Sequence, residues 1–419
     1  MAARRCTGVQ GNSQHLLYIR HIVPISVISA NWPLLFGMGV LMLGAGLQGT
    51  LLGVRATIEG YPPQVTGLIM SAYYVGYLVG TRIAPPLLRQ VGHIRVFAAL
   101  AAVASVAVLT QGTFINPPVW GAMRLLSGVC FAGIYVVAES WLNDRASKEN
   151  RGRLLAIYML VLYGGLGAAQ FLLVLANPRT ATPFMLVSVL ISLALVPIVI
   201  SAQQVPERAA PSKVRLIDLY RNSPLGVVSV TLSGVISSII FSMGPVYARL
   251  SGLETHQVAS FMGVSILAAV VTQYPMGRLS DRMDRRTVIA TVCVVAMLAA
   301  ASIALFHEIP HPLFLLLAAL FSGFALTLYS LSVSHINDKL EPQQMVAASG
   351  AILLLNGTAA AAGPLLAGGL MAVFGPRAYF ATLATLTGLL FVYDLWRKSR
   401  RGPVPASLKA PFVRSEPRA

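Results

Sequence analysis

The chain contains Tyr135-Val-Val-Ala-Glu-Ser140-Trp-Leu-Asn143-Asp144-Arg145 and repeats it 194 positions later as Tyr329-Ser-Leu-Ser-Val-Ser334-His-Ile-Asn337-Asp338-Lys339. Each copy ends a long apolar segment. Gln64-Val65 and Gln257-Val258 likewise begin two apolar segments 193 positions apart. Repeats at this spacing indicate two homologous halves in one chain. Such halves are typical of membrane transporters, in which the substrate site lies between the repeats.

The composition is that of a membrane protein. Of the 419 residues, 56% are hydrophobic and only 11% are charged, and the mean hydropathy is +0.72. Soluble domains carry about 25% charged residues. A membrane-spanning helix needs about 20 mainly apolar residues. Twelve such segments are predicted, at 33–54, 64–84, 95–114, 118–141, 153–175, 183–202, 223–247, 257–277, 286–306, 312–335, 343–371 and 376–396.

The positive charge falls on one side of these segments. The formal net charge is +17, and with both termini placed in the cytoplasm, 26 of the 31 lysines and arginines lie on the cytoplasmic side and four on the other. This bias predicts that orientation and accounts for the basic composition without nucleic acid. The basic tail 397–419 is expected either to contact anionic lipid headgroups or simply to be solvated.

The spans predict an all-α membrane protein built from two parallel six-helix repeats. Residues 33–202 form the first bundle and 223–396 the second. The polar segment 203–222 is a cytoplasmic linker with a short amphipathic helix at 214–220. Residues 1–32 are interpreted as a cytoplasmic tail, with a cleaved signal peptide as the alternative.

The sequence offers no cofactor or metal site. Cys6, Cys130 and Cys293 form no spaced set, which argues against a disulfide or a metal centre. The stretch His307-Glu308-Ile-Pro310-His311 matches the zinc-protease pattern, but Pro310 interrupts the helix that would place both histidines on one face. A phosphate-binding P-loop is also absent. We therefore expect neither a cofactor nor an enzyme.

Four stretches resemble the major facilitator superfamily of transporters, and in particular its YcaD-like branch. They are Arg124-Leu-Leu-Ser-Gly128, Glu139-Ser140, Asn150-Arg-Gly-Arg153-Leu-Leu-Ala156 and Pro275-Met-Gly277-Arg-Leu-Ser-Asp281-Arg282. The resemblance covers essentially the whole chain. It implies a twelve-helix fold that works by alternating access, and it implies no particular substrate.

The same resemblance implies a cytoplasmic gate. The family pattern G-x-x-x-D-R-x-G-R-R appears as Gly277 to Arg286, with Asp284 in place of the glycine; the first-half copy is degraded and carries Arg89 where the acid belongs. A carboxylate is favoured beside arginines and a helix N-terminus. The predicted latch pairs Asp281 with the segment 151–153, and Arg89 with Glu341; the alternative is that these charges only set orientation. The predicted gate residues are Asp281, Arg282, Arg285, Arg286, Arg151, Arg153, Arg89 and Glu341.

Arg124 and Glu139 are charges inside the fourth span. A charge at membrane depth costs about 2.5–3.5 kcal/mol and normally faces a cavity or a partner. The spacing of Arg124 and Gly128 resembles the family's fourth-helix motif, which is associated with coupling or substrate contact; the alternative is an arginine that snorkels to the outer interface. Glu139 lies about 22 Å further along the helix. It is interpreted as a gate-region ion pair or, alternatively, as a protonatable coupling site.

Polar residues at membrane depth are candidates for the wall of the cavity. Each could instead hydrogen-bond a neighbouring helix. The predicted substrate-binding or coupling residues are Arg124, Glu139, Gln48, Tyr163, Gln170 and Asn356, and further cavity candidates are Tyr74, Tyr77, Ser237 and Tyr329.

These features predict a monomeric secondary or facilitative transporter in a bacterial cytoplasmic membrane, moving a small organic solute. Arg124 suggests an anionic or amphipathic solute. Proton-coupled efflux of cationic or amphipathic drugs is the alternative, and a membrane sensor or scaffold is the alternative of another class. The predicted first and seventh spans hold no aspartate or glutamate, which leaves uniport, exchange and proton coupling all open.

Overall fold

We describe the protein from a computed structural model. It describes residues 25–145, 151–201, 216–306, 308–340 and 342–400. Most of the predicted N-terminal tail, most of the linker and the C-terminal tail from residue 401 lie outside these residues, as does Cys6. The described residues fold into helices and turns without a β-strand, which confirms the predicted all-α fold class.

The long helices follow the predicted spans closely. Their apolar side chains leave water, and each helix satisfies its own backbone hydrogen bonds, as a membrane requires. The first six are α1 (Ile25–Ile58), α2 (Pro63–Val91), α3 (His93–Thr113), α4 (Pro117–Arg145), α5 (Arg151–Leu172) and α6 (Thr182–Ile200). The remainder are α7 (Leu216–Asn222), α8 (Pro224–Leu250), α9 (Thr255–Arg282), α10 (Arg285–Leu305), α11 (His311–Ala325), α12 (Leu328–Asn337), α13 (Pro342–Phe374) and α14 (Ala378–Arg400).

Eleven segments of the described chain are long and apolar enough to cross a membrane, with α11 and α12 counted as one segment. Besides the short α7, the described helix that falls outside this set is α2. It is 29 residues long and carries Arg82, Arg89 and two prolines, Pro85 and Pro86, toward its end. It packs between α4 and α13, so neighbouring helices surround a segment whose composition alone is less apolar.

The tenth span is predicted as one helix over 312–335, but the structure divides it into α11 and α12 at Leu326 and Thr327. The Thr327 hydroxyl donates to the Phe324 carbonyl at 2.7 Å. Side-chain bonds of this kind compete with the helix ladder and bend helices. At the other end of the span, Pro310 directly precedes α11, so Glu308 and His311 share no helix; His307 lies outside the described residues.

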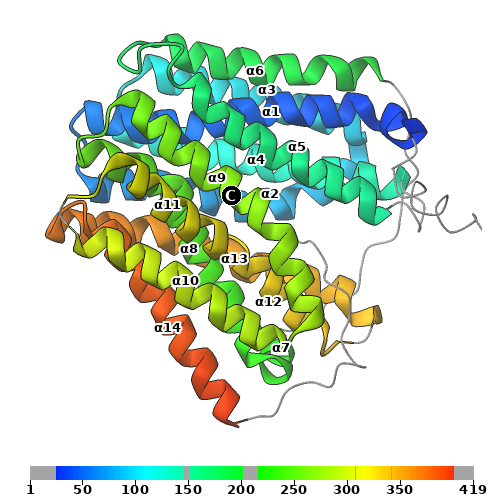
Figure 1. Ribbon diagram of the computed structural model, residues 1–419. Helices are drawn as coiled ribbons and strands as arrows, with labels where there is room; N and C mark the ends of the chain where they lie inside the picture. Colours follow the sequence, from blue (N-terminus) through cyan, green and yellow to red (C-terminus); the bar gives the residue numbers. More distant parts are fainter. Residues whose placement is uncertain (1–24, 146–150, 202–215, 307, 341, 401–419) are drawn as a thin grey trace, which may run out of the picture.

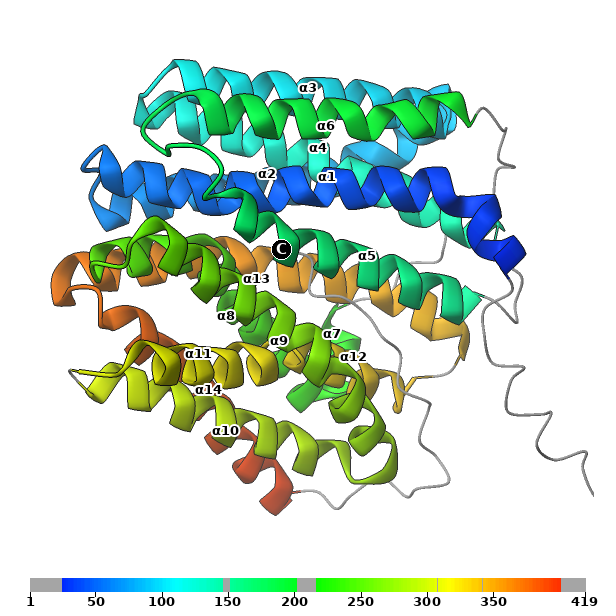
Figure 2. The same ribbon diagram turned by 45° about the horizontal axis from the view of Figure 1, so that its top comes forward.

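The helices form two groups (Figures 1 and 2). Helices α1–α6 pack mainly with one another, as do α8–α14. The groups meet where α2 packs on α13, α5 on α9, and α1 on α8. We call the end of the bundle that carries α7 the α7 end, and the end that carries the links 59–62 and 375–377 the opposite end.

Close contact between the groups at the opposite end depends on glycine. Gly67 of α2 and Gly368 of α13 face each other, and a Cβ added to Gly368 would lie 2.6 Å from the Pro63 carbonyl oxygen and 3.2 Å from the Gly67 Cα. Small residues let helix backbones approach this closely. Leu78 and Gly357 also touch, at the middle of the same two helices. The contact between α2 and α13 therefore runs from the opposite end to mid-depth.

Candidate functional site

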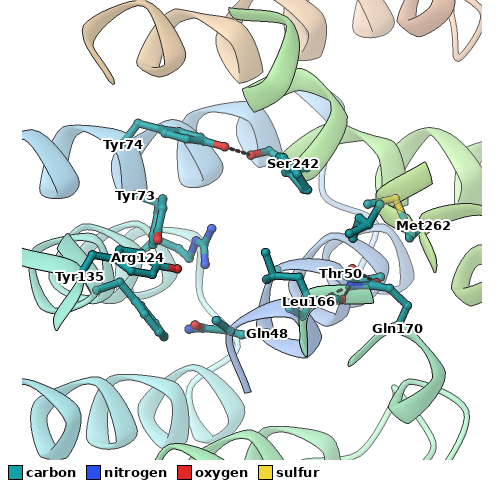
Figure 3. A pocket seen from close by; sticks show the side chains of 16 residues that line it. Gln48, Thr50, Tyr73, Tyr74, Arg124, Tyr135, Leu166, Gln170, Ser242 and Met262 are labelled. Carbon is teal, nitrogen blue, oxygen red and sulfur yellow. Dashed lines mark hydrogen bonds between the residues drawn. The ribbon is translucent and has the colours of Figure 1, made fainter. Parts of the chain in front are cut away.

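A small cavity lies at the meeting point of the two groups, nearer the opposite end than the α7 end (Figure 3). Helices α1, α2, α4 and α5 of the first group and α8 and α9 of the second contribute to its wall. Its volume is about 60 Å³. Ligand pockets for drug-sized molecules are about 300–1,000 Å³, so this cavity holds only a few water molecules in the present arrangement. Its labelled side chains are Gln48, Thr50, Tyr73, Tyr74, Arg124, Tyr135, Leu166, Gln170, Ser242 and Met262.

Arg124 is the charge in this cavity. Its side chain is 6% exposed, and its guanidinium carbon lies 4.5 Å from the centre of the Tyr73 ring. The buried Nε has no hydrogen-bond partner, and no aspartate or glutamate is among the described residues that line the cavity. The Tyr73 ring supplies a cation–π contact, which leaves the N–H groups of Arg124 available to a ligand. The side chain is thus directed to the interior.

Two glutamine amides are held in place on the first group. The Gln48 amide donates to Gln111 Oε1 at 2.9 Å, which ties α1 to α3. Thr50 Oγ1 donates to Gln170 Oε1 at 2.5 Å, and Gln170 Nε2 donates to the Leu166 carbonyl at 2.9 Å. The first bond joins α1 to α5, and the second holds the Gln170 amide against its own helix. Because the amides are fixed by partners on their own group, the polar wall exists before any ligand arrives.

The wall from the second group is mostly apolar. Phe241, Met262 and Ile266 line it, together with one hydroxyl, that of Ser242. The Tyr74 and Ser242 hydroxyls are 3.3 Å apart and form a hydrogen bond between α2 and α8. The two walls therefore differ in chemistry, with the charge and the amides on one side and a hydrophobic surface on the other.

Three of the six predicted binding residues line the cavity, namely Arg124, Gln48 and Gln170, and so does Tyr74. Asn356 does not: its amide donates to the Val230 carbonyl at 3.0 Å and joins α13 to α8. Glu139 and Tyr163 lie on α4 and α5 outside the lining, and both are half-buried. The remaining candidates Tyr77, Ser237 and Tyr329 are buried in helix contacts.

Tyr73, Thr50, Tyr135 and Ser242 line the cavity although none of them was predicted to do so. Tyr73 adjoins Tyr74 in a run of tyrosines on α2. Only the rotation of α2 against α4 decides that Tyr73 lies beside Arg124, and that rotation is set by packing. The sequence pattern that could have indicated Tyr73 as a cavity residue is the run of tyrosines on α2.

The predicted gate residues are partly described. Arg285 is buried at the α7 end of α10, and its Nε donates to Asp338 Oδ2 at 2.7 Å. Asp281 is 3.5 Å from the same guanidinium and is 42% exposed. Asp338 was not among the predicted gate residues, although its place in the repeated stretch was a signal. The side chains of Arg151 and Arg153 and all of Glu341 lie outside the described residues, while Arg89 and Arg282 are exposed.

The sequence matches a known protein family along most of its length. The sequence model of the Major Facilitator Superfamily matches residues 34–357 and 252–418. The uncharacterized MFS-type transporter YcaD of Escherichia fergusonii is 29% identical over 377 residues, which cover 89% of this chain and 97% of that protein. The protein of the same name from Salmonella typhimurium is 28% identical over 375 residues, covering 89% of this chain and 96% of that one.

Solved structures share the fold at low sequence identity. A crystal structure of the nucleoside transporter NupG has a TM-score of 0.73 with 13% identity, covering 88% of this chain and 98% of that one. A bacterial homologue of the human lysosomal transporter Spinster has a TM-score of 0.71 with 14% identity, covering 92% and 98%. At these identities the likeness concerns the fold alone.

Proposed function

The chain belongs to the major facilitator superfamily, and from this premise we propose that it moves a small organic anion across the membrane by alternating access between α1–α6 and α8–α14. It is a multi-pass membrane protein, and its relatives are named as transporters. Such a protein binds its substrate between two groups of helices that expose the site to one side at a time. The cavity at Arg124 has that position.

The observation that carries the proposal is the buried, uncompensated guanidinium of Arg124. A buried charge is costly unless it is paired, and the described residues around the cavity supply a ring but no carboxylate. A substrate carboxylate or another anionic group would complete the site, since arginine presents a fork of N–H donors to such a group. Gln48 and Gln170 would bind polar atoms of the solute, and Phe241 and Met262 its apolar body.

The same charge weighs against the alternative of cationic drug efflux. A cationic ligand would enter a site whose single described charge repels it, at low effective dielectric. The aromatic and methionine side chains suit an amphipathic body of either sign. The sign of the ligand is therefore decided by Arg124.

The proposal also covers the orientation of the protein in the membrane, the membrane in which it lies and the boundaries of its two bundles. The 26-to-4 distribution of basic residues supports an α7 end on the cytoplasmic side of a bacterial inner membrane. The glycine-based contact at the opposite end supports an arrangement that is closed to the outside. The two bundles would comprise 33–202 and 223–396, joined by the linker 203–222. Coupling to protons and the latch formed by Asp281 stay predictions.

Ligand-induced thermal stabilisation of the purified protein tests the proposal. A ligand at 100 times its Kd stabilises the native state by about 2.7 kcal/mol. We expect members of a panel of small organic anions to raise the midpoint of unfolding. Because a hydrogen bond to a charged group contributes about 1.5–3 kcal/mol, Arg124→Gln should weaken that binding about 10- to 150-fold.

Arg179→Gln is the matched control, because Arg179 is exposed in the link between α5 and α6. It should bind the same anion as the wild type does. Arg124→Lys retains the charge and loses the fork, so an intermediate affinity is expected. Stabilisation by cationic drugs that is equal in the wild type and Arg124→Gln would refute the anion proposal and favour drug efflux.

A further inference from the structure

A second polar pocket lies at the α7 end of the second group, away from the central cavity. Its wall comes from α8, α10, α12 and α14, and from the residues that follow α12. Four of its six lining side chains are basic: Arg286, His335, Lys339 and Arg397. The other two are Pro224 and Leu225, the first residues of α8. The lining includes no aspartate or glutamate among the described residues.

The two inner members of this basic pocket are deeply buried. Arg286 is 6% exposed and His335 is 3% exposed. The Nε2 atom of His335 is buried, and no described residue forms a hydrogen bond with it. A buried polar atom without a partner costs about 1–3 kcal/mol. The site is thus incomplete as the protein presents it.

The nearest acids lie outside the pocket and are shared with other cations. Asp338 accepts from Arg285 at 2.7 Å, and Asp394 lies 3.2 Å from Lys398. Asp394 is attracted by Arg286 as well as by Lys398, and Asp284 accepts a hydrogen bond from the Arg286 backbone N–H at 3.1 Å. Because no acid among the described residues enters the pocket itself, an anion there would lower the repulsion among its basic side chains.

The N-terminus of α8 adds a second anion-binding feature. This helix has 27 residues, and its first turn leaves backbone N–H groups without intrahelical acceptors. Ser223 occupies the N-cap position, but its side chain does not cap the helix. Its hydroxyl is buried without a partner among the described residues. Uncapped N–H groups and the helix dipole together favour a bound anion.

We propose that this basic pocket binds a phosphate group. A phosphate offers several acceptor oxygens, which matches the cationic side chains, the His335 imidazole and the first turn of α8. The space now present is about 10 Å³, enough for about one water molecule. Lys339 and Arg397 are long and only half-buried, so they can move outward to admit the phosphate while Arg286 and His335 stay in place.

Two sources could supply this phosphate: the headgroup of an anionic lipid, or a phosphate compound in solution. Trp396 lies beside the pocket on α14 and is 50% exposed. Arg397 and Arg400 lie 5.7 and 5.8 Å from its ring centre. Tryptophan and arginine are typical of the membrane interface, which places the pocket where both sources are available.

Direct binding measurements on the full chain in a maltoside detergent test the site. Inorganic phosphate and dihexanoyl phosphatidylglycerol are titrated separately at constant ionic strength. We expect saturable binding of at least one, weakened about tenfold in Lys339→Gln and in Arg397→Gln, as befits the loss of a charged hydrogen bond. Arg400→Gln is the matched control, because Arg400 is exposed one turn further along α14 and lies outside the lining.

Binding of inorganic phosphate would support the site with a soluble ligand, and binding of the lipid alone would support it with a headgroup. The proposal is overturned if the wild type binds neither, or if Arg400→Gln loses as much affinity as Arg397→Gln does. The thermal midpoint of each variant without ligand shows whether that variant is folded. If Lys339→Gln does not fold, the affinity of Arg397→Gln, which is also at a half-buried position, tests the proposal instead.

Discussion

Gly368→Ala is expected to open the contact between α2 and α13 at the opposite end, whereas Gly369→Ala is expected to leave it closed. A Cβ at position 368 would lie 2.6 Å from the Pro63 carbonyl oxygen, which is backbone and cannot turn aside. Nonbonded heavy atoms settle at about 3.5–4.0 Å, so the helices must separate by about 1 Å. Overpacking of this kind costs about 1–3 kcal/mol, or about 5- to 150-fold in the population of the closed arrangement.

The measurement is the distance between spin labels on Asn116 and His256, which are exposed near this end on the two groups of helices. Gly368→Ala should lengthen and broaden the distance distribution. Gly369→Ala is a sharp control because the same methyl group, one residue further along α13, meets nothing within 4 Å. If the two variants give the same distances, the contact between these helices does not hold the groups together.

Asp338→Asn is expected to destabilise the protein by about 3–5 kcal/mol, the usual cost of breaking a buried ion pair. Arg285 is 1% exposed and its side chain would keep its charge after Asp338 had lost its own. The midpoint of thermal unfolding measures the effect. The double variant Arg285→Met with Asp338→Leu removes both charges and should recover much of the loss, because well-packed apolar residues often replace a buried pair without cost.

Asp281→Asn provides the comparison. Asp281 is 42% exposed and 3.5 Å from the same guanidinium, and exposed pairs contribute about 0–1 kcal/mol. A small change is therefore expected for this variant. If Asp281→Asn and Asp338→Asn lowered the midpoint of thermal unfolding equally, the buried pair of Arg285 and Asp338 would not stabilise the α7 end more than the exposed Asp281 does.

Hydropathy was sufficient to predict most of the long helices, because a membrane-spanning helix needs about 20 mainly apolar residues whatever its neighbours are. Arg124, Gln48 and Gln170 could be found because polar groups inside an apolar helix must meet a partner or a cavity. Pattern alone could not choose between those two outcomes. Asn356 bonds α8 and Gln170 lines the cavity, and the difference lies in how the helices are rotated in the packed bundle.

Pairings at the α7 end were harder to predict for a related reason. The sequence shows a cluster of charge from Asp281 to Arg286, but it does not predict that Asp338 lies against Arg285. That contact joins α10 to the end of α12, 53 residues away. The break at Leu326 and Thr327 is where α12 begins, and a hydropathy profile does not reveal such a break.

The unequal walls of the central cavity have an evolutionary consequence. Under the proposed function, the charged and polar groups of the solute are held by residues of α1, α4 and α5, whereas its apolar body contacts Phe241, Met262 and Ile266 of α8 and α9. Substitutions in the second half of the gene can then change which molecules are accepted while the requirement for an anion is kept. The two halves of the repeat would then divide the task of selection, the first setting the charge of the solute and the second its size and shape.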